Sequence, residues 1–450
     1  MTALTVDLGQ FVAELALSAI PPEGLTVAKT GFTDCFGVMV AGARDPAVAL
    51  VDRALSSRDH DSLAPLLPSK ELRNVEDAAL VNGMAAHVLD YDDVTLDGHP
   101  SAVLVPAILA EGHACGSSGA ELLVAYVAGY EVWAELLVRE PVPLHQKGWH
   151  PTTVRGAVAA AAACARLRRL DARLTATAMA IAASLASGLV ANFGSLTKSF
   201  QVGRAAQSGV VAARLAAAGL TASLDALEHP SGFLAALSPT GRADRARAFV
   251  AARKEWHIVR QGLNVKRYPL CYATHRAIDA AIDLVSRHDL KPGDVDHVSV
   301  ATGRTQMVML RNPRPQNALE AKFSMEFAMA ASIVARKVGL AQLDDRFVRT
   351  PEIQNLFSRV SCEVTDETMD GSAFAPFETV AIRTASGRVL TSERIVHAKG
   401  SHVRPLDRDE LWTKFADCLD KEFPRPAKER AFDRLQGLER QNTPADLMEF

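Results

Sequence analysis

A group of acidic residues stands between two helical patterns in the first quarter of the chain. Asp90, Asp92 and Asp93 follow a helical pattern over Glu76–Leu89. Carboxylates at the C-terminal end of a helix face the negative end of its dipole, which costs about 0.3–1 kcal/mol each. Residues that lower stability without a local gain are typical of functional sites. The alternative is an acidic loop in contact with solvent, and these residues alone leave both interpretations open.

Two histidines lie directly before helices that begin with proline. His99 precedes Pro100, and His150 precedes Pro151. Because proline is favoured at the first position of a helix, both rings should lie at the positive end of a helix dipole. That position keeps the imidazole neutral near pH 7 and able to accept a proton, and free N–H groups beside it can bind carboxylate oxygens. Either histidine alone could be a cap or a packing residue, but the repeated pattern favours acid–base chemistry.

Two lysines could bind an anionic substrate. Lys198 should lie in a turn directly after a helix without charged residues, where a cation needs an anionic partner. Lys266 lies at the junction of two predicted domains and is followed by Cys271 and His275. Clefts between domains are preferred places for small-molecule sites. The alternative for both lysines is an ordinary surface position, which is the commonest state of this residue type.

The elements that must position these residues are helices over residues 1–264. Apolar residues recur with helical spacing from Leu8 to about Gly262, and no stretch alternates for long enough to predict a strand. The segment Leu174–Thr197 carries no charge, but its weak hydropathy indicates a buried helix rather than a membrane span. A further helix should open at Gly203. The predicted helices are Glu76–Leu89, Ala102–His113, Gly119–Arg139, Gly156–Leu170, Arg173–Asn192 and Arg204–Leu220.

The pattern changes after Asn264, where helices and strands mix. The tail from Asp407 returns to a helical period and should pack on the first domain. The predicted fold class is therefore mainly α: an all-helical domain of residues 1–264, completed by residues 401–450, and a smaller α+β lid domain of residues 265–400. Predicted helices of the lid are Thr274–His288 and Ser324–Val338, and predicted strands are Val295–Thr302, Val360–Thr365, Thr379–Thr384 and Arg388–Val396.

Composition narrows the class of protein. The 450 residues carry a net charge of −3, with 48% hydrophobic and 22% charged residues. This balance lacks the basic surface expected of a nucleic-acid binder. The N-terminus has no basic region, and Asp7 and Glu14 interrupt its apolar stretch, so no secretory signal is expected. We expect a cytoplasmic protein without a membrane or nucleic-acid partner.

The cysteines argue against a metal or redox centre. The six cysteines, at positions 35, 115, 164, 271, 362 and 418, form no C-x-x-C pair and no zinc-binding spacing with histidine. Scattered cysteines without a secretory signal are typical of buried small apolar residues. We therefore expect no metal and no cofactor.

Several short motifs together resemble the MmgE/PrpD family. Their order and spacing are similar over nearly the whole chain, although each motif alone has low specificity. The motifs are the Asp-Tyr-Asp-Asp and His-Pro-Ser groups within His87–Pro106, Gly148-Trp149-His150-Pro151-Thr152, Thr197-Lys198 with Gly203-Arg204-Ala205-Ala206, Lys266-x-Tyr268-Pro269-x-Cys271-x-x-Thr274-His275, and Ala321-Lys322-Phe323-Ser324.

The resemblance implies a helical domain, a smaller lid domain, a homodimer, and an active site between the domains that works without metal or organic cofactor. Members of the family include 2-methylcitrate dehydratase, cis-aconitate decarboxylase and iminodisuccinate epimerase. Family site positions carry over onto Asp93, His99, His150, Lys198 and Lys266, and also onto Asp92, Thr95 and Cys271.

Three features depart from the family pattern. Many relatives carry histidine where this chain has Gln201, and many carry tyrosine where it has Phe327. The longer aspartate–histidine insert of methylcitrate dehydratases is absent between Asp93 and His99. These departures affect the expected substrate and the group that delivers the proton.

The leading hypothesis is a metal-independent lyase of dehydratase type that acts on a hydroxy di- or tricarboxylate, such as a 2-methylcitrate-like acid. Lys198, Lys266 and a helix N-terminus would bind carboxylates, because charge builds up on carboxylate oxygens when a neighbouring proton is removed. His99 would exchange that proton while Asp93 orients or charges the ring, and His150 would serve the opposite face or the departing hydroxyl group. The alternatives are an epimerase, a decarboxylase of an iminodisuccinate- or cis-aconitate-like acid, and a non-catalytic binding protein, which would need no histidine at the helix starts.

Overall fold

The chain divides into two units. The computed structural model describes residues 3–55, 63–250, 255–369, 374–419 and 423–448. Unit 1 contains Met1–Asn264 and Leu411–Phe450, and unit 2 contains Val265–Glu410. The C-terminal return thus starts at Leu411 rather than at residue 401. The preceding residues are tied to unit 2, since the Gly400 carbonyl accepts a hydrogen bond from Val265 N at 2.8 Å.

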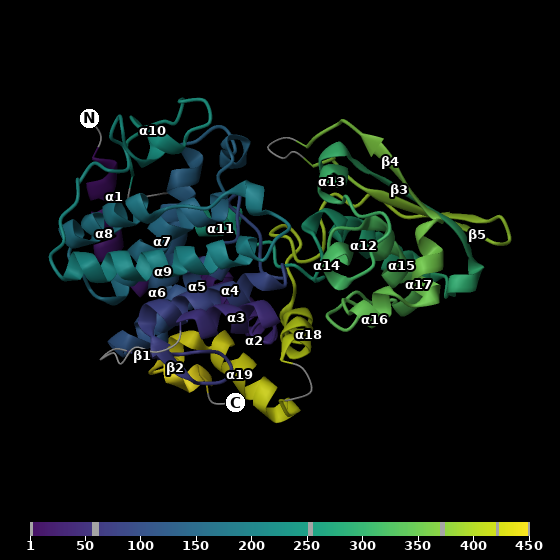
Figure 1. The fold of residues 1–450 in the computed structure, drawn as a ribbon, viewed down its shortest axis with the longest axis horizontal. Coiled ribbons are helices and arrows are strands. Elements are labelled where there is room, and N and C mark those ends of the chain that lie inside the picture. Colours follow the sequence, from purple (N-terminus) through teal and green to yellow (C-terminus); the bar gives the residue numbers. More distant parts are fainter. Residues whose placement is uncertain (1–2, 56–62, 251–254, 370–373, 420–422, 449–450) are drawn as a thin grey trace. The chain divides into compact units, whose positions relative to one another are not determined.

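Unit 1 is a packed array of helices (Figure 1). The C-terminal helices return to this array, where α19 packs on α2. Within the described residues, no helix combines the length and the apolar character needed to span a membrane. The helices are α1 Leu4–Glu14, α2 Pro22–Gly42, α3 Pro46–Leu55, α4 Val75–Val88, α5 Pro100–Cys115, α6 Gly119–Val138, α7 Pro151–Leu167, α8 Ala172–Leu185, α9 Thr197–Ala217, α10 Phe233–Leu237, α11 His257–Gln261, α18 Arg408–Cys418 and α19 Arg425–Gln436.

Glycine lets the central helices α4, α7 and α9 approach closely. A Cβ atom on Gly203 of α9 would lie 2.2 Å from the Leu80 carbonyl oxygen of α4, and one on Gly83 would lie 2.8 Å from the Gly203 Cα. A Cβ on Gly209 would lie 2.3 Å from the Cβ of Ala160 on α7. The helices therefore meet backbone to backbone at these points.

The expectation that unit 1 is all-helical was wrong in detail. The unit contains a two-stranded antiparallel sheet of β1 (Leu63–Pro65) and β2 (Leu72–Asn74), so it is not purely helical. Each strand has only three residues, which is too short for an alternating pattern to be visible in the sequence. The main prediction, a mainly α protein, is confirmed.

The uncharged segment is not one helix. α8 ends at Leu185, and residues 186–196 form a loop containing Gly188 (φ +128°) and Gly194 (φ +89°), where the backbone leaves the helical region. α9 begins at Thr197, so Lys198 lies in the first turn of a helix rather than in a turn before one. Gly203 lies inside α9 and does not open it.

Unit 2 combines a four-stranded sheet with helices. The strand order is β4-β3-β5-β6; β3 pairs with β4 in parallel, and the other neighbours are antiparallel. Helix α12 packs on β5 and α15 on β4. The strands are β3 Val295–Gly303, β4 Val360–Thr365, β5 Thr379–Thr384 and β6 Val389–Thr391, and the helices are α12 His275–Arg287, α13 Arg304–Met309, α14 Ala318–Ala321, α15 Met325–Ala335, α16 Asp345–Val348 and α17 Pro351–Phe357.

Most predicted elements of unit 2 are confirmed, including β4 and β5 at their predicted bounds. The last strand is shorter than the predicted Arg388–Val396. It ends because the Ser392 hydroxyl, rather than a main-chain carbonyl, accepts the hydrogen bond of Val380 N at 3.0 Å. Pairing resumes only as the isolated bridge between Glu378 and Ile395.

Candidate active site

The acidic loop after α4 is held in an irregular conformation by partners from other elements. Asp90 has φ +52°, which turns the chain directly after the helix, and Leu96 has φ +52°. The Trp133 indole N–H of α6 donates to the Leu96 carbonyl at 3.1 Å, and Arg155 of α7 pairs with Asp97 at 3.1 Å. Positive φ is unfavourable for a residue such as leucine, so these contacts stabilise the loop in this shape.

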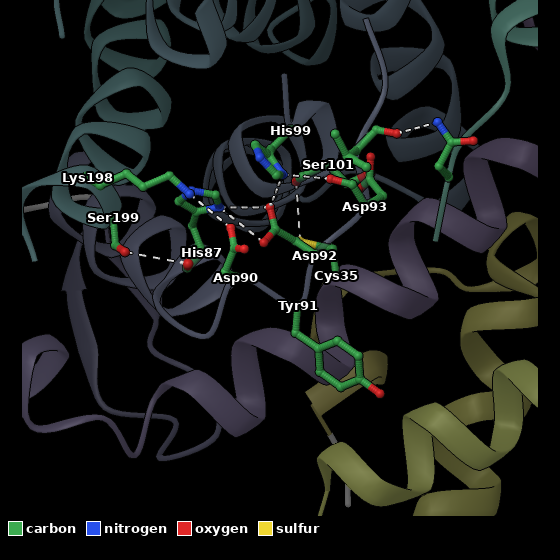
Figure 2. Close-up of polar contacts among 12 residues, drawn as sticks. Cys35, His87, Asp90, Tyr91, Asp92, Asp93, His99, Ser101, Lys198 and Ser199 are labelled. Carbon is green, nitrogen blue, oxygen red and sulfur yellow. Dashed lines mark hydrogen bonds and ion pairs between the residues drawn. The ribbon is translucent and has the colours of Figure 1, made fainter. Parts of the chain in front are cut away.

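Asp92 is the centre of the site (Figure 2). Its carboxylate is fully buried and accepts from the His87 Nδ1 at 2.9 Å and from the His99 Nδ1 at 3.1 Å. His87 comes from the last turn of α4, and His99 is the N-cap residue of α5. The two rings lie 4.5 Å apart between centroids. The predicted substrate-binding Asp92 is thus enclosed by two histidines.

The contacts of His99 differ from those we expected. Its Nδ1 lies 2.9 Å from the main-chain carbonyl of Asp93, whereas the carboxylate that it contacts belongs to Asp92. A carbonyl and a carboxylate can only accept, so Nδ1 of His99 carries the proton. When the ring is neutral, its Nε2 therefore has the free electron pair.

The charges of this cluster are set by burial and by hydrogen bonds. Burial lowers the pKa of His87 to about 4, against the opposing effect of Asp92. Burial alone would raise the pKa of Asp92, but His87 and His99 outweigh it and hold that pKa well below its usual range. Asp92 is therefore ionised near pH 7, and His87 is neutral. The buried Nε2 of His87 has no hydrogen-bond partner among the described residues.

Asp93 differs from its neighbour in charge. Burial raises the pKa of Asp93 to about 8; the Ser101 hydroxyl lowers it, and Asp92 and Asp34 raise it further. Neither carboxyl oxygen has a hydrogen-bond partner of good geometry among the described residues. Asp93 is therefore a protonated acid near pH 7, although it lies next to the ionised Asp92.

His150 is the third histidine of the site. It is the N-cap residue of α7, as the sequence predicts, and its ring centroid lies 6.4 Å from that of His87. The Nδ1 atom lies 2.8 Å from Oε1 of Gln201 on α9. Burial lowers the pKa of His150 to about 2, helped by His87 and Lys198, so the ring is neutral near pH 7.

Lys198 reaches the acidic loop from the first turn of α9 (Figure 2). Its Nζ pairs with Asp90 at 2.9 Å and lies 5.6 Å from the centre of the Phe193 ring. Both charged side chains are partly exposed, at 18% for Lys198 and 12% for Asp90. The predicted need for an anionic partner is met within the chain by Asp90.

The same cluster contains a group of potential metal ligands. One ligand atom each from His87, Asp92 and His99 lies within 4.8 Å of the others. His87 and His99 are twelve positions apart, a spacing that no simple metal-binding motif describes. Imidazole and carboxylate suit several divalent ions. The expectation of no metal, which rests on sequence spacing, thus stays a prediction.

The predicted site residues fall into two groups. Asp92, Asp93, His99, His150 and Lys198 gather in unit 1. Thr95 also lies there, where its backbone pairs with Gly98 and closes the turn of the loop at 2.9 Å in both directions.

The other predicted residues belong to unit 2. Lys266 is 2% exposed, and Cys271 is 8% exposed and precedes the short 3-10 helix Tyr272–Thr274. His275 is fully buried, with its Nε2 3.3 Å from the Leu270 carbonyl oxygen and its ring in contact with Tyr268 and Tyr272.

Sequence reasoning gave no role to His87 or Gln201. His87 occurs among Met84, Ala85, Ala86 and Val88 in a helical pattern, and a titratable group in so apolar a stretch needs a polar partner. That signal could have identified His87. The contact of Gln201 with His150 joins residues far apart in the sequence, so only the fold shows it.

Comparison with known proteins agrees with the motifs. A family model described as the MmgE/PrpD N-terminal domain matches residues 6–246, and the MmgE/PrpD C-terminal domain matches residues 268–438. Cis-aconitate decarboxylase of Homo sapiens is 28% identical over 374 residues, which cover 80% of this chain and 76% of that protein. The Mus musculus protein of the same name is 28% identical over 376 residues, which cover 80% of this chain and 75% of that protein. An Aspergillus terreus cis-aconitate decarboxylase is 22% identical over 474 residues, or 100% and 96%.

Proposed function

Because this chain belongs to the MmgE/PrpD family, we propose that it is a lyase that acts on a polycarboxylate by moving a proton at a carbon beside a carboxylate group. The observation that carries the proposal is the arrangement of three histidines. His87, His99 and His150 each have Nδ1 in a hydrogen bond, which leaves Nε2 as the nitrogen that can exchange a proton. Asp93, protonated near pH 7, lies in the same loop as an acid.

Decarboxylation of a cis-aconitate-like tricarboxylate is the reaction that we propose first. The three relatives described above carry the name cis-aconitate decarboxylase. In such a reaction the C–C bond to the leaving carboxylate breaks, its electron pair stays on the carbon skeleton, a proton from the enzyme is added to carbon, and CO₂ departs. The negative charge that develops needs a cation, and Lys198 is the partly exposed cation of this site.

Dehydration of a hydroxy polycarboxylate is the second candidate. It requires a base that removes a proton beside a carboxylate and an acid that protonates the leaving hydroxyl group. The His99 ring as base and the protonated Asp93 as acid are such a pair, and the two residues are joined by the hydrogen bond between His99 Nδ1 and the Asp93 carbonyl. An epimerase would use the same base and would return the proton to carbon.

The experiment is a panel of polycarboxylates incubated with the purified protein in D₂O and followed by NMR and CO₂ release. Release of CO₂ identifies a decarboxylase. A new double bond with loss of the hydroxyl group identifies a dehydratase. Deuterium exchange without net reaction identifies an epimerase. If no polycarboxylate of the panel gives any of these three results, the proposal is overturned.

The histidine roles are tested with the best substrate of that panel. We expect His99→Ala to lose about 10²–10⁴-fold in turnover, the usual contribution of an acid–base group, with little change in thermal stability. His113→Ala, on the same helix but outside the site, is the control. Deuterium exchange that survives His99→Ala but not His150→Ala would reverse their roles, and exchange that survives both would make Lys198 the next candidate.

Lys198 and Lys266 are proposed as the carboxylate-binding cations. Changing either to Ala should reduce turnover far more than stability, and Lys→Arg should restore little, because the two cations differ in shape and hydration. The exposed Lys291 provides the control. Full activity in both Ala variants would show that these are ordinary structural lysines. We also propose binding roles for Thr95, Cys271 and His275. We further propose that the protein is a homodimer with a cytoplasmic location, and sedimentation velocity tests the dimer.

A further inference from the structure

Gln201 connects two parts of the site. It lies on α9, three residues after Lys198, and is 8% exposed. Its Oε1 lies 2.8 Å from the Nδ1 of His150, and its Nε2 donates to the Leu189 carbonyl at 3.2 Å. Because a carbonyl can only accept, the amide nitrogen must face Leu189, and the amide oxygen must face the histidine.

This orientation determines where the proton of His150 resides. The amide oxygen accepts, so Nδ1 of the ring must donate, and the neutral ring then has its free electron pair on Nε2. Resting on the function proposed above, we propose that Gln201 is a positioning residue that holds His150 in the Nδ1–H tautomer and thereby makes Nε2 its proton-accepting atom.

The backbone around Gln201 is shaped to support this contact. His150 N donates to the Gly188 carbonyl at 3.0 Å, so the loop that Gln201 binds is also fastened to the start of α7. Gly188 has φ +128°, and a Cβ there would lie 2.2 Å from the Thr153 hydroxyl and 3.1 Å from Oε1 of Gln201. Only glycine allows the loop to approach both residues.

The chemical identity of the partner matters as much as its position. His87 from α4, His99 from the start of α5 and Lys198 from α9 are the titratable groups that act on His150, and each disfavours the imidazolium ion. A carboxylate in place of the amide would favour that ion, and a histidine could donate, accept or become charged. An amide remains neutral at every pH, so it fixes the tautomer and favours the charged ring only through its hydrogen bond, without the added attraction of a negative charge. The amide of Gln201 is therefore suited to fix the tautomer of a neutral His150.

Two variants separate these effects. Gln201→Met has a similar length but replaces the amide oxygen with a thioether sulfur, which is only a weak acceptor, and Gln201→Glu keeps an acceptor oxygen but adds a charge. Gln207→Met is the matched control, since Gln207 is also on α9, is also 8% exposed, and loses its hydrogen bond to Asp77 instead. The ring nitrogens are followed by long-range ¹H–¹⁵N correlation spectra, with His150→Asn to assign the signals, alongside kcat and KM from pH 5 to 9.

We expect the wild-type protein and the Gln207→Met control to show a proton on Nδ1 of His150. Gln201→Met should show a mixture of tautomers and a lower kcat with little change in KM, the loss remaining within the about 10²–10⁴-fold that a general base supplies. Gln201→Glu should keep the proton on Nδ1 but form imidazolium at a higher pH than the wild type, whose His150 has a pKa of about 2, so that an acidic limb of kcat due to His150 moves toward the measured range.

A proton on Nε2 in the wild type, or an unchanged tautomer and kcat in Gln201→Met, would overturn the proposal. If Gln201→Met fails to fold, Gln201→Glu decides the question, because a purely structural role predicts no shift of the acidic limb and no new imidazolium signal. The tautomer of His150 is measured by NMR without substrate. The result therefore does not depend on whether the proposed function is correct.

Discussion

Asp92 keeps a negative charge where no water reaches it, and two imidazole N–H groups make that possible. A buried carboxylate without such donors would take up a proton, as its neighbour Asp93 does. At the same pH near 7, Asp92 is therefore ionised and the adjacent Asp93 is neutral. Their different partners, rather than their residue type, separate an acid from a fixed anion.

The protonation of Asp93 makes a prediction about stability. Its pKa is about 8 in the folded chain and about 4 when unfolded, so the folded state binds more protons between these values, and stability falls as the pH rises through that window. From pH 6.5 to 8, wild type should lose about 2 kcal/mol relative to Asp93→Asn. Urea unfolding at several pH values measures this difference, and parallel pH dependence of the two proteins would contradict it.

A second prediction at this scale concerns metals. Each Nδ1 of His87 and His99 lies at hydrogen-bond distance from Asp92, an arrangement that protons on the rings satisfy without an ion. Activity should therefore persist after exhaustive chelation, and elemental analysis should show no stoichiometric zinc or iron. Loss of activity that zinc or iron restores would instead identify the three side chains as ligands.

Much of the residue-level site could be predicted from the sequence. His99 and His150 were recognisable because Pro100 and Pro151 mark helix starts, which is local information. The pairing of Lys198 with Asp90 was only half predictable, since a cation beside apolar sequence needs an anion but the sequence does not say which one.

At the scale of elements, helix α18 supports the acidic loop after α4. Lys414 of α18 pairs with the buried Asp34 of α2, and its Nζ donates to the Tyr91 carbonyl at 2.8 Å and lies 4.1 Å from the centre of the Tyr91 ring. The side chains of Lys414 and Asp34 are 3% and 1% exposed. A segment near the end of the chain thus holds the residue that precedes Asp92.

The buried pair gives a third prediction. Lys414→Met should destabilise unit 1 by about 3–5 kcal/mol, because it leaves the Asp34 carboxylate without its cation. The double variant Asp34→Leu with Lys414→Met should recover most of that loss, since no buried charge remains. Chemical denaturation of the three proteins measures the coupling. Additive losses in the double variant would show that the two residues do not stabilise each other.

The largest error at the element scale, the helix predicted to continue past Leu185, has a clear physical cause. Residues 186–196 look helical because they carry no charge and continue the apolar spacing of the preceding helix, yet Gly188 and Gly194 adopt positive φ and allow a loop. The loop is stabilised by contacts with His150 and Gln201, which periodicity cannot report. The strands of unit 2 were predictable since β-branched residues and turn residues mark them locally.

At the scale of the whole molecule, unit 2 has a core of its own. Buried apolar residues from Tyr268 to Leu390 form one cluster, built from α12, α15 and the sheet. An independent core is the main requirement for independent folding. This organisation was visible in the sequence as the change of pattern after Asn264.

We therefore expect the fragment Val265–Glu410 to fold alone. Circular dichroism should show mixed helix and strand, and denaturation should be cooperative with dispersed NMR signals. Val380→Asp, which buries a charge in the sheet, provides the control and should unfold the fragment. A fragment that is disordered without that substitution would show that unit 2 depends on unit 1.

The contact between Gly83 and Gly203 has a consequence for how this protein can change over evolution. Most packed helices absorb substitutions by rearranging side chains between them, but here one backbone rests on the other. His87 lies one turn after Gly83 on α4, and Lys198 and Gln201 lie just before Gly203 on α9. A larger residue at either glycine would push α4 and α9 apart and displace the site residues of both helices. We therefore expect new substrate preferences to arise in segments where side chains separate the backbones, while the contact between Gly83 and Gly203 stays unchanged.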